Sequence, residues 1–142
     1  MNLSNFTALL LITVYCAPSV FAADIVVTVT GLKSATGNII ARLHADPESF
    51  PMDPSKGVAE ISVPITDKTT TFTLEDIDPG TYALAVVHDE NGNNKLDFNR
   101  LSIPKEPVGF SNNAKGFMGP PKFKKAQFSV EKDDVALNVR VK

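Results

Sequence analysis

The chain has 142 residues, of which 43% are hydrophobic, and its formal net charge is -2. This length suits one ordinary domain with a packed core, and the near-neutral charge gives no electrostatic indication of nucleic-acid binding, which requires a basic face. Lysines do gather late in the chain, at Lys115, Lys122, Lys124 and Lys125. They indicate either solvated strand faces or a site for a polyanion.

Residues 1–22 have the pattern of a secretory signal peptide. A short apolar stretch at residues 9–14 is followed by Pro18, and Val20 and Ala22 occupy the positions where signal peptidase requires compact side chains. The stretch is too short for a membrane span, which needs about 20 apolar residues. We therefore expect cleavage after Ala22, a periplasmic or extracellular location, and no membrane span in the mature chain.

The mature chain would be residues 23–142, which we expect to form one domain. The only cysteine, Cys16, lies in the segment that is removed, so the mature chain has no disulfide. Val14 and Tyr15 before it do not match the small residues that precede a lipoprotein cysteine. Stability must therefore come from a packed core or from a bound ion.

Most of the mature chain shows the period-two alternation of half-buried strands. In residues 24–30, Ile25, Val27 and Val29 share one face. Residues 80–88 are apolar on both faces, which predicts a central strand. Further strands are predicted at residues 38–44, 59–65, 69–75, 123–130 and 134–142.

The connections between these strands support the same fold class. The turns "SATG", "DIDPG" and "ENGN" separate the strands at even spacing, and no stretch has the apolar stripe of an amphipathic helix. Pro64 suits an edge strand. The pattern predicts an all-β fold, an antiparallel Greek-key β-sandwich of about seven to eight strands.

Two proline-rich segments are not predicted to be strands. Residues 45–57 should wrap an edge of the sandwich. Residues 97–122 form a connection so long that it must either be functional or contain short structure of its own.

The loop "HDENGNNKLDF", residues 88–98, interrupts the strands with acidic and amide side chains. Its register matches a calcium loop, in which oxygens at alternate positions converge on a hard cation. Asn94 stands where such loops have glycine, and Arg100 stands where they have a bidentate glutamate, so the site would be weak. The predicted ligands are Asp89, Asn91, Asn93, Asp97 and the carbonyl of Lys95.

A simpler interpretation of the same loop remains open. Asn91-Gly92 is a favoured pair for a type I′ turn, so the flanking residues could be the two strands of a hairpin. Asp89 and its neighbours would then only cap backbone groups in Asx-turns.

Nucleophilic catalysis has no candidate in this chain. The motifs of serine hydrolases, zinc proteases and phosphate-binding loops are absent from the sequence. His44 and His88 end their predicted strands, where we expect exposure to solvent rather than a metal site. We expect the protein not to be an enzyme.

The segment "GFSNNAKGFMGPP", residues 109–121, is the second candidate for function. It combines aromatic and apolar side chains with amides, as ligand clefts do. Alternatively, Phe110 and Phe117 plug the end of the sandwich and complete its core. The predicted ligand-binding residues are His88, Phe110, Asn112, Asn113, Phe117 and Met118.

Two stretches carry a family resemblance. "DIDPGTYALAVVHDENGNNKLD" and "IPKEPVGFSNNAKGFMGPPKFKKAQF" resemble a secreted bacterial family of unknown function, family 2141, over most of the mature chain. "PGTYALAV" is similar to a strand of transthyretin-like and carboxypeptidase-regulatory-like sandwiches, which implies a Greek-key fold but no function. The hydrolase branch of that fold ends in "YRGS", whereas this chain ends in "LNVRVK", so that activity is not implied.

These observations predict an exported, non-catalytic binding or structural module with a weak calcium loop. The alternative is a periplasmic small-molecule carrier or enzyme that uses a cleft under residues 109–121, beside His88. An envelope protein as partner would instead require a flat apolar patch. The sequence identifies neither the small molecule nor the partner.

Overall fold

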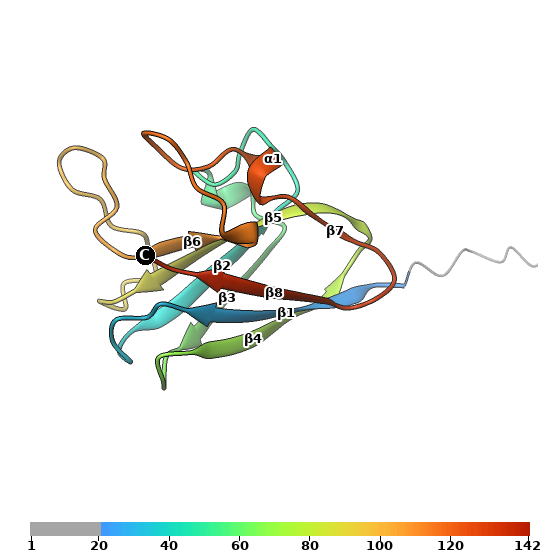
Figure 1. The fold of residues 1–142 in the computed structure, drawn as a ribbon, viewed down its shortest axis with the longest axis horizontal. Coiled ribbons are helices and arrows are strands. Elements are labelled where there is room, and N and C mark those ends of the chain that lie inside the picture. Colours follow the sequence, from blue (N-terminus) through green and yellow to red (C-terminus); the bar gives the residue numbers. More distant parts are fainter. Residues whose placement is uncertain (1–20) are drawn as a thin grey trace, which may run out of the picture.

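The computed structural model describes residues 21–142, so the predicted signal peptide lies outside the described residues except for Phe21 and Ala22. Two β-sheets pack face to face, with loops and short helices covering one outer face (Figure 1). The elements in chain order are β1 (Ala23–Thr30), β2 (Asn38–His44), η1 (Pro54–Lys56), β3 (Ala59–Pro64), β4 (Thr70–Ile77), β5 (Gly80–Asp89), β6 (Val108–Phe110), η2 (Ser111–Asn113), α1 (Phe123–Ala126), β7 (Phe128–Val130) and β8 (Val135–Arg140).

The first sheet has the order β4-β1-β8. β1 is a run of β-branched residues, which favour the pleated backbone. It pairs antiparallel with β4 and parallel with β8. The β1–β8 pair is the parallel exception among the strand pairs of residues 21–142, and all the other pairs are antiparallel.

The second sheet has the order β3-β2-β5-β6, and β7 pairs with the start of β5. The strand β5 is central, as its apolar residues on both faces predict, because it contacts β2 on one edge and both β6 and β7 on the other. Its inner face packs on the first sheet, and its outer face is covered by loops.

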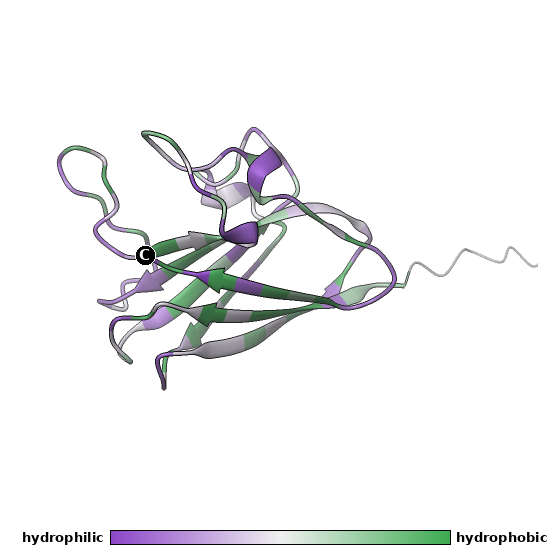
Figure 2. Cartoon of the chain, in the orientation of Figure 1, coloured by the Kyte–Doolittle hydropathy of each residue, from purple (hydrophilic) through white to green (hydrophobic). Residues whose placement is uncertain are grey.

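The main core lies between the two sheets. Ile25, Val27 and Val29 of β1 are fully buried there, with Leu84 and Val86 of β5 on the facing sheet. Burying one such side chain contributes roughly 1.5–3 kcal/mol, so this interface is the main source of stability in a fold without disulfides. Hydrophobic and hydrophilic residues alternate along β8 (Figure 2), because one face of that strand points into the core and the other into solvent.

A short seam closes one side of the sandwich between β6 and β8. The amide of Val108 donates to the carbonyl of Lys142 at 3.2 Å, and the amide of Lys142 donates to the carbonyl of Val108 at 3.1 Å. Gly109 allows this approach, because a Cβ there would lie 2.8 Å from the carbonyl oxygen of Arg140. The long connection thus contains a strand that the sequence pattern does not reveal.

A second, smaller apolar cluster lies on the outer face of the second sheet. Phe50 from the loop after β2 and Phe123 of α1 meet with ring centroids 5.8 Å apart, over Ala83 of β5. The segment 45–57 therefore packs on the outer face of a sheet, whereas the sequence pattern predicted that it wraps an edge. The cluster is the reason that β5 and β2 are apolar on both faces.

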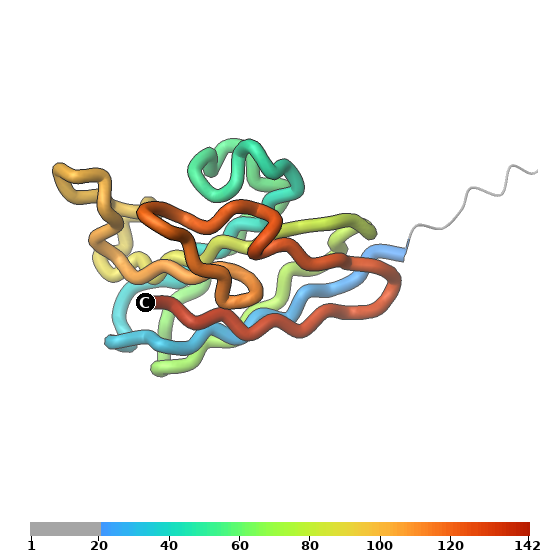
Figure 3. The backbone as a smooth tube through the Cα atoms, turned by 45° about the horizontal axis from the view of Figure 1, so that its top comes forward, coloured from blue at the N-terminus to red at the C-terminus, as the bar shows by residue number. Residues whose placement is uncertain are grey.

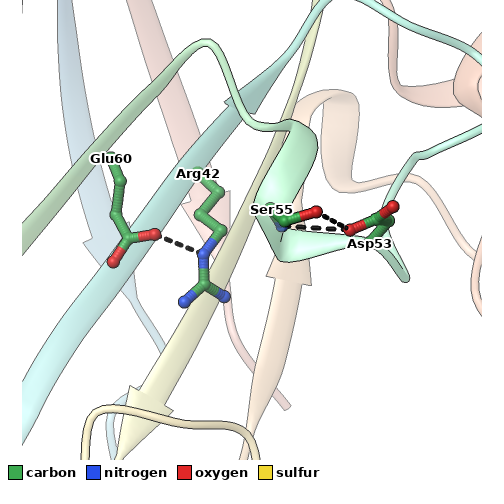
Figure 4. A network of polar contacts seen from close by, with 4 residues as sticks. All are labelled: Arg42, Asp53, Ser55 and Glu60. Carbon is green, nitrogen blue, oxygen red and sulfur yellow. Dashed lines mark hydrogen bonds and ion pairs between the residues drawn. The ribbon is translucent and has the colours of Figure 1, made fainter.

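Polar contacts order the rim of this covered face (Figure 4). Arg42 of β2 and Glu60 of β3 are directly opposite in the register and form an ion pair, with 2.5 Å between Nε and Oε2. Asp53 caps η1 by accepting from the amide and the hydroxyl of Ser55. The hydrogen bond from the Ser55 hydroxyl is the main reason that the pKa of Asp53 is lowered.

The prediction of an all-β sandwich of about seven to eight strands is confirmed. One predicted strand is wrong in part: residues 123–126 form the short helix α1, and strand begins only at Phe128. The apolar residues Phe123 and Ala126 are both buried, at the spacing of one helical turn. A single turn is too short to produce a recognisable helical stripe in the sequence.

Candidate cation-binding loop

The loop begins where β5 ends, at Asp89. This carboxylate is 0% exposed. One oxygen accepts from the amide of Asn93 at 3.2 Å, and the other accepts from the amide of Asn94 at 2.8 Å. The chain after β5 therefore turns back, so that the amides of Asn93 and Asn94 face the Asp89 carboxylate.

The side-chain amides of Asn91 and Asn93, at the next alternate positions, continue the turn. The Oδ1 atoms of Asn91 and Asn93 accept from the amides of Asn93 and Lys95, at 3.0 and 2.9 Å. Their Nδ2 groups both donate to Oδ2 of Asp97, at 2.6 and 2.9 Å. The predicted side-chain ligands thus form one connected group.

The backbone of the loop follows the cation-loop template rather than the hairpin. Asn94 has a left-handed φ of 60° at the position that usually requires glycine. A type I′ turn needs positive φ at both central residues, but of Asn91 and Gly92 only Gly92 has it, with φ 71°. The interpretation of residues 91–92 as a type I′ turn is therefore wrong, and no strand of the described residues follows until β6. The capping of backbone amides in Asx-turns, which the same interpretation predicted, is present at Asn91 and Asn93.

Glu106 closes the loop, and the sequence analysis did not identify it. Its Oε1 accepts from the amide of Glu90 at 3.0 Å and its Oε2 accepts from the amide of Asp97 at 3.1 Å, so one buried carboxylate holds both ends of the loop. The available signal was a charged residue directly before the uncharged run "PVGF", residues 107–110. That signal does not indicate which backbone groups the carboxylate reaches.

The negative charge of this loop has no basic side chain against it. Within residues 21–142 the ion pair between side chains is Arg42–Glu60, and Nδ1 of His88 lies 3.9 Å from Oε1 of Glu90, a pair that is ionic only when the imidazole is protonated. Asp89, Asp97 and Glu106 are not paired with a cationic side chain. Buried charges are usually paired or bound to a metal. Carboxylate, amide and carbonyl oxygens are the hard donors that calcium prefers.

The same part of the chain also limits the kind of ion that fits. No three carboxylate, imidazole or thiolate groups of the described residues gather into a metal site. A cation would therefore depend on the amide oxygens and the Lys95 carbonyl as well as on Asp89 and Asp97. This set suits a weakly held calcium ion and not zinc, which prefers nitrogen and sulfur.

The histidines lie on opposite faces of the second sheet. His88 is opposite Ile39 on the core face, and its Nε2 donates to the carbonyl of Thr36 at 2.9 Å. His44 is opposite Ala83 on the outer face, with its ring edge-on to Phe50. Both are fully buried, so the expectation that they are exposed is wrong.

Three of the predicted ligand-binding residues instead contribute to packing and backbone contacts. Phe110 packs against the small cluster around Phe50. The Nδ2 group of Asn112 donates to the carbonyl of Gln127 at 2.8 Å, and Oδ1 of Asn113 accepts from the amide of Arg140 at 2.8 Å. Both asparagines have positive φ, so their amides stabilise a sharp turn at η2.

Phe117 and Met118, which were also predicted to bind the ligand, project into solvent. Phe117 does not complete the core, as its side chain is 89% exposed. An open hollow of about 460 Å³ lies nearby, but neither residue lines it. Its lining residues are Pro47, Phe50, Pro51, Pro120, Pro121, Lys122, Phe123 and Lys124.

The fold and this loop together define a class: an all-β sandwich with a polar, acid-containing loop at the end of its central strand. Residues 27–138 match the family model described as an uncharacterized protein conserved in bacteria (DUF2141), and the chain belongs to this family. Comparisons with curated proteins and with solved structures gave no match. Within residues 21–142, no helix is long and apolar enough to cross a membrane.

Proposed function

We propose that this protein is an exported, non-catalytic β-sandwich module whose loop at residues 89–97 binds a weakly held calcium ion. The observation that carries the proposal is the fully buried Asp89, which shares a hydrogen-bonded loop with Asp97 and has no cationic partner. In this proposal Asp89 and Asp97 supply the charge, and Asn91, Asn93 and the Lys95 carbonyl supply neutral oxygens. Glu106 is a positioning residue that holds the loop closed.

The ion would stabilise the loop and not take part in a reaction. The missing bidentate glutamate supports an affinity at the weak end, on the order of 10⁻⁴–10⁻³ M. At ten times the Kd, such an ion contributes about 1.4 kcal/mol to the free energy of unfolding. For a chain of this size, that corresponds to a rise in Tm of about 5 °C.

Thermal unfolding of residues 23–142, which contain every strand, tests this proposal. We expect a higher Tm in millimolar calcium than in excess EDTA, and a smaller rise in magnesium, which demands a stricter octahedral geometry. Asp97→Asn should abolish the calcium response and leave the Tm in EDTA little changed, since an asparagine oxygen can still accept from Asn91 and Asn93.

The exposed acid Asp133 provides the matched control. Asp133→Asn should keep the full calcium response, because the residue lies in the turn before β8. Equal Tm values in EDTA and calcium for the unsubstituted protein would refute the calcium site.

A further inference from the structure

A small apolar tip, Gly116–Gly119, stands out on the loop before α1. Its two side chains, Phe117 and Met118, are 89% and 94% exposed. Large apolar side chains at this level of exposure contribute nothing to the core, and together at one tip they mark a contact surface.

The tip is a tight turn. Gly116 packs so closely against the carbonyl of Gly119 that a Cβ at residue 116 would not fit. At its base, the Nζ group of Lys125 donates to the carbonyl of Lys115 at 3.5 Å. The short turn between these points leaves its two apolar side chains outside the molecule.

A second loop, residues 97–105, also has an apolar tip. Leu101 is 78% exposed and Ile103 is 54% exposed. The side chain of Asn99 orders this loop by accepting from the amides of both residues, at 2.8 and 3.0 Å. Both tips project from the same side of the molecule, away from the turns at residues 31–37 and 65–69 (Figures 1 and 3).

Positive charge accompanies the two tips. Residues 99–125 contain a single acid, Glu106, and its charge is directed to backbone amides inside the molecule. Lys122 and Lys124 are exposed and border the open hollow beside the first tip. The basic residues of this segment are Arg100, Lys105, Lys115, Lys122, Lys124 and Lys125.

We propose that these two tips dock the protein on an anionic phospholipid surface. The apolar side chains would enter the boundary between headgroups and acyl chains, while the lysines around them bind phosphate groups. The shape favours lipid over a protein partner, because a protruding tip needs a matching hole in a protein, whereas a bilayer deforms around it. The four apolar side chains of the tips are not among the proposed calcium ligands, but the second loop begins at one of them, Asp97, and the amide of Lys105 donates to its carbonyl. The proposal is therefore tested without calcium.

Co-sedimentation of residues 23–142 with lipid vesicles, in EDTA, tests the proposal. We expect binding to phosphatidylcholine vesicles that contain about 30 mol% phosphatidylglycerol, and little binding to pure phosphatidylcholine. Added salt should weaken the binding, because it screens exposed charges.

Two pairs of variants separate the apolar and the electrostatic contributions. Phe117→Ser should weaken vesicle binding by about tenfold, whereas Val26→Ser, at an exposed valine on the outer face of β1, should not. Lys122→Gln with Lys124→Gln should weaken it by about twentyfold. Lys33→Gln with Lys68→Gln, in the two turns far from the tips, removes the same charge and should leave binding unchanged.

The absence of tryptophan from the chain allows a direct probe of insertion. In Phe117→Trp, the emission should shift to the blue when the anionic vesicles are added, and in Val26→Trp, on the outer face of β1, it should not. If the unsubstituted protein does not sediment with the anionic vesicles, the proposal is overturned. A tip that binds only a protein partner would give this result. An unshifted Phe117→Trp emission while the protein sediments, or an equal loss of binding in the control variants, also overturns the proposal.

Discussion

His44 is a polar side chain whose burial costs free energy of folding. It is fully buried against Phe50, and neither ring nitrogen has a hydrogen-bond partner. A neutral imidazole keeps one N–H, so at least this donor is unsatisfied, at a cost of about 1–3 kcal/mol. Burial is the main cause that lowers the pKa of His44, and the charge of Arg42 is the second.

This lowered pKa predicts a pH dependence of stability. Above the ordinary value of 6.5, His44 is neutral in both the folded and unfolded states. As the pH falls from there toward the lowered pKa of the folded state, the unfolded state binds a proton first, so stability decreases. His44→Leu should remove this decrease and should not destabilise the protein at neutral pH. Urea unfolding between pH 7 and pH 5 measures the stability at neutral pH and its decrease toward acid pH. If stability decreases equally in His44→Leu, the pH dependence does not come from His44.

Glu106 is a second residue whose role comes entirely from its position. Because its carboxylate accepts from the amides of Glu90 and Asp97, Glu106→Ala should lower the free energy of unfolding by about 3 kcal/mol. It should also reduce the calcium-dependent rise in Tm. Glu131→Ala, at an exposed acid after β7, is the control, and denaturant unfolding in EDTA and in calcium is the measurement. Equal stabilities of the two variants would show that Glu106 does not hold the loop.

At the scale of elements, β6 and the residues after it connect the two sheets. Ser111 follows β6 and is fully buried; its hydroxyl accepts from the amide of Leu84 at 2.9 Å and donates to the carbonyl of Ala126 at 2.5 Å. One side chain thus fixes α1 on the outer face of β5. Together with the β6–β8 seam, this contact determines where the long connection lies.

The seam predicts a specific sensitivity at Gly109. Its φ is not left-handed, so the cost of Gly109→Ala comes from space alone: the new Cβ would meet the Arg140 carbonyl and Cγ1 of Val139, at 2.8 and 2.9 Å. Overpacking of this kind should cost about 1–3 kcal/mol in denaturant unfolding. Gly57→Ala, where the nearest atom would be 3.5 Å away, should be close to neutral. A neutral Gly109→Ala would show that the seam is not tightly packed.

At the scale of the whole molecule, the strands of the described residues all lie between Ala23 and Arg140, and these residues contain no cysteine. The core of the described residues therefore forms without a disulfide. We predict that the exported form begins at Ala23. Expression in a bacterial host, fractionation and N-terminal sequencing of the product check this prediction. A protein that stays in the cytoplasm with Met1 or Asn2 at its N-terminus would contradict export.

Several features of the fold follow from the sequence alone. The period-two pattern predicts the burial of Ile25, Val27 and Val29, because successive side chains of a strand point to opposite faces. The two apolar faces of residues 80–88 predict a central strand for the same reason. The spacing of oxygens from Asp89 to Asp97 predicts a connected loop, because residues so close in sequence reach one another through local turns.

Only the tertiary structure determines the contacts between distant segments. The buried histidines, the clasp of Glu106 on the loop, and the β6–β8 seam each join residues far apart in the chain, and a periodic pattern carries no information about which distant backbone groups will meet. The same limit applies to Phe117 and Met118. Their apolar character predicted a core or a cleft, whereas the tight turn at Gly116 leaves them in solvent, because burial depends on how the whole chain packs and not on hydrophobicity alone.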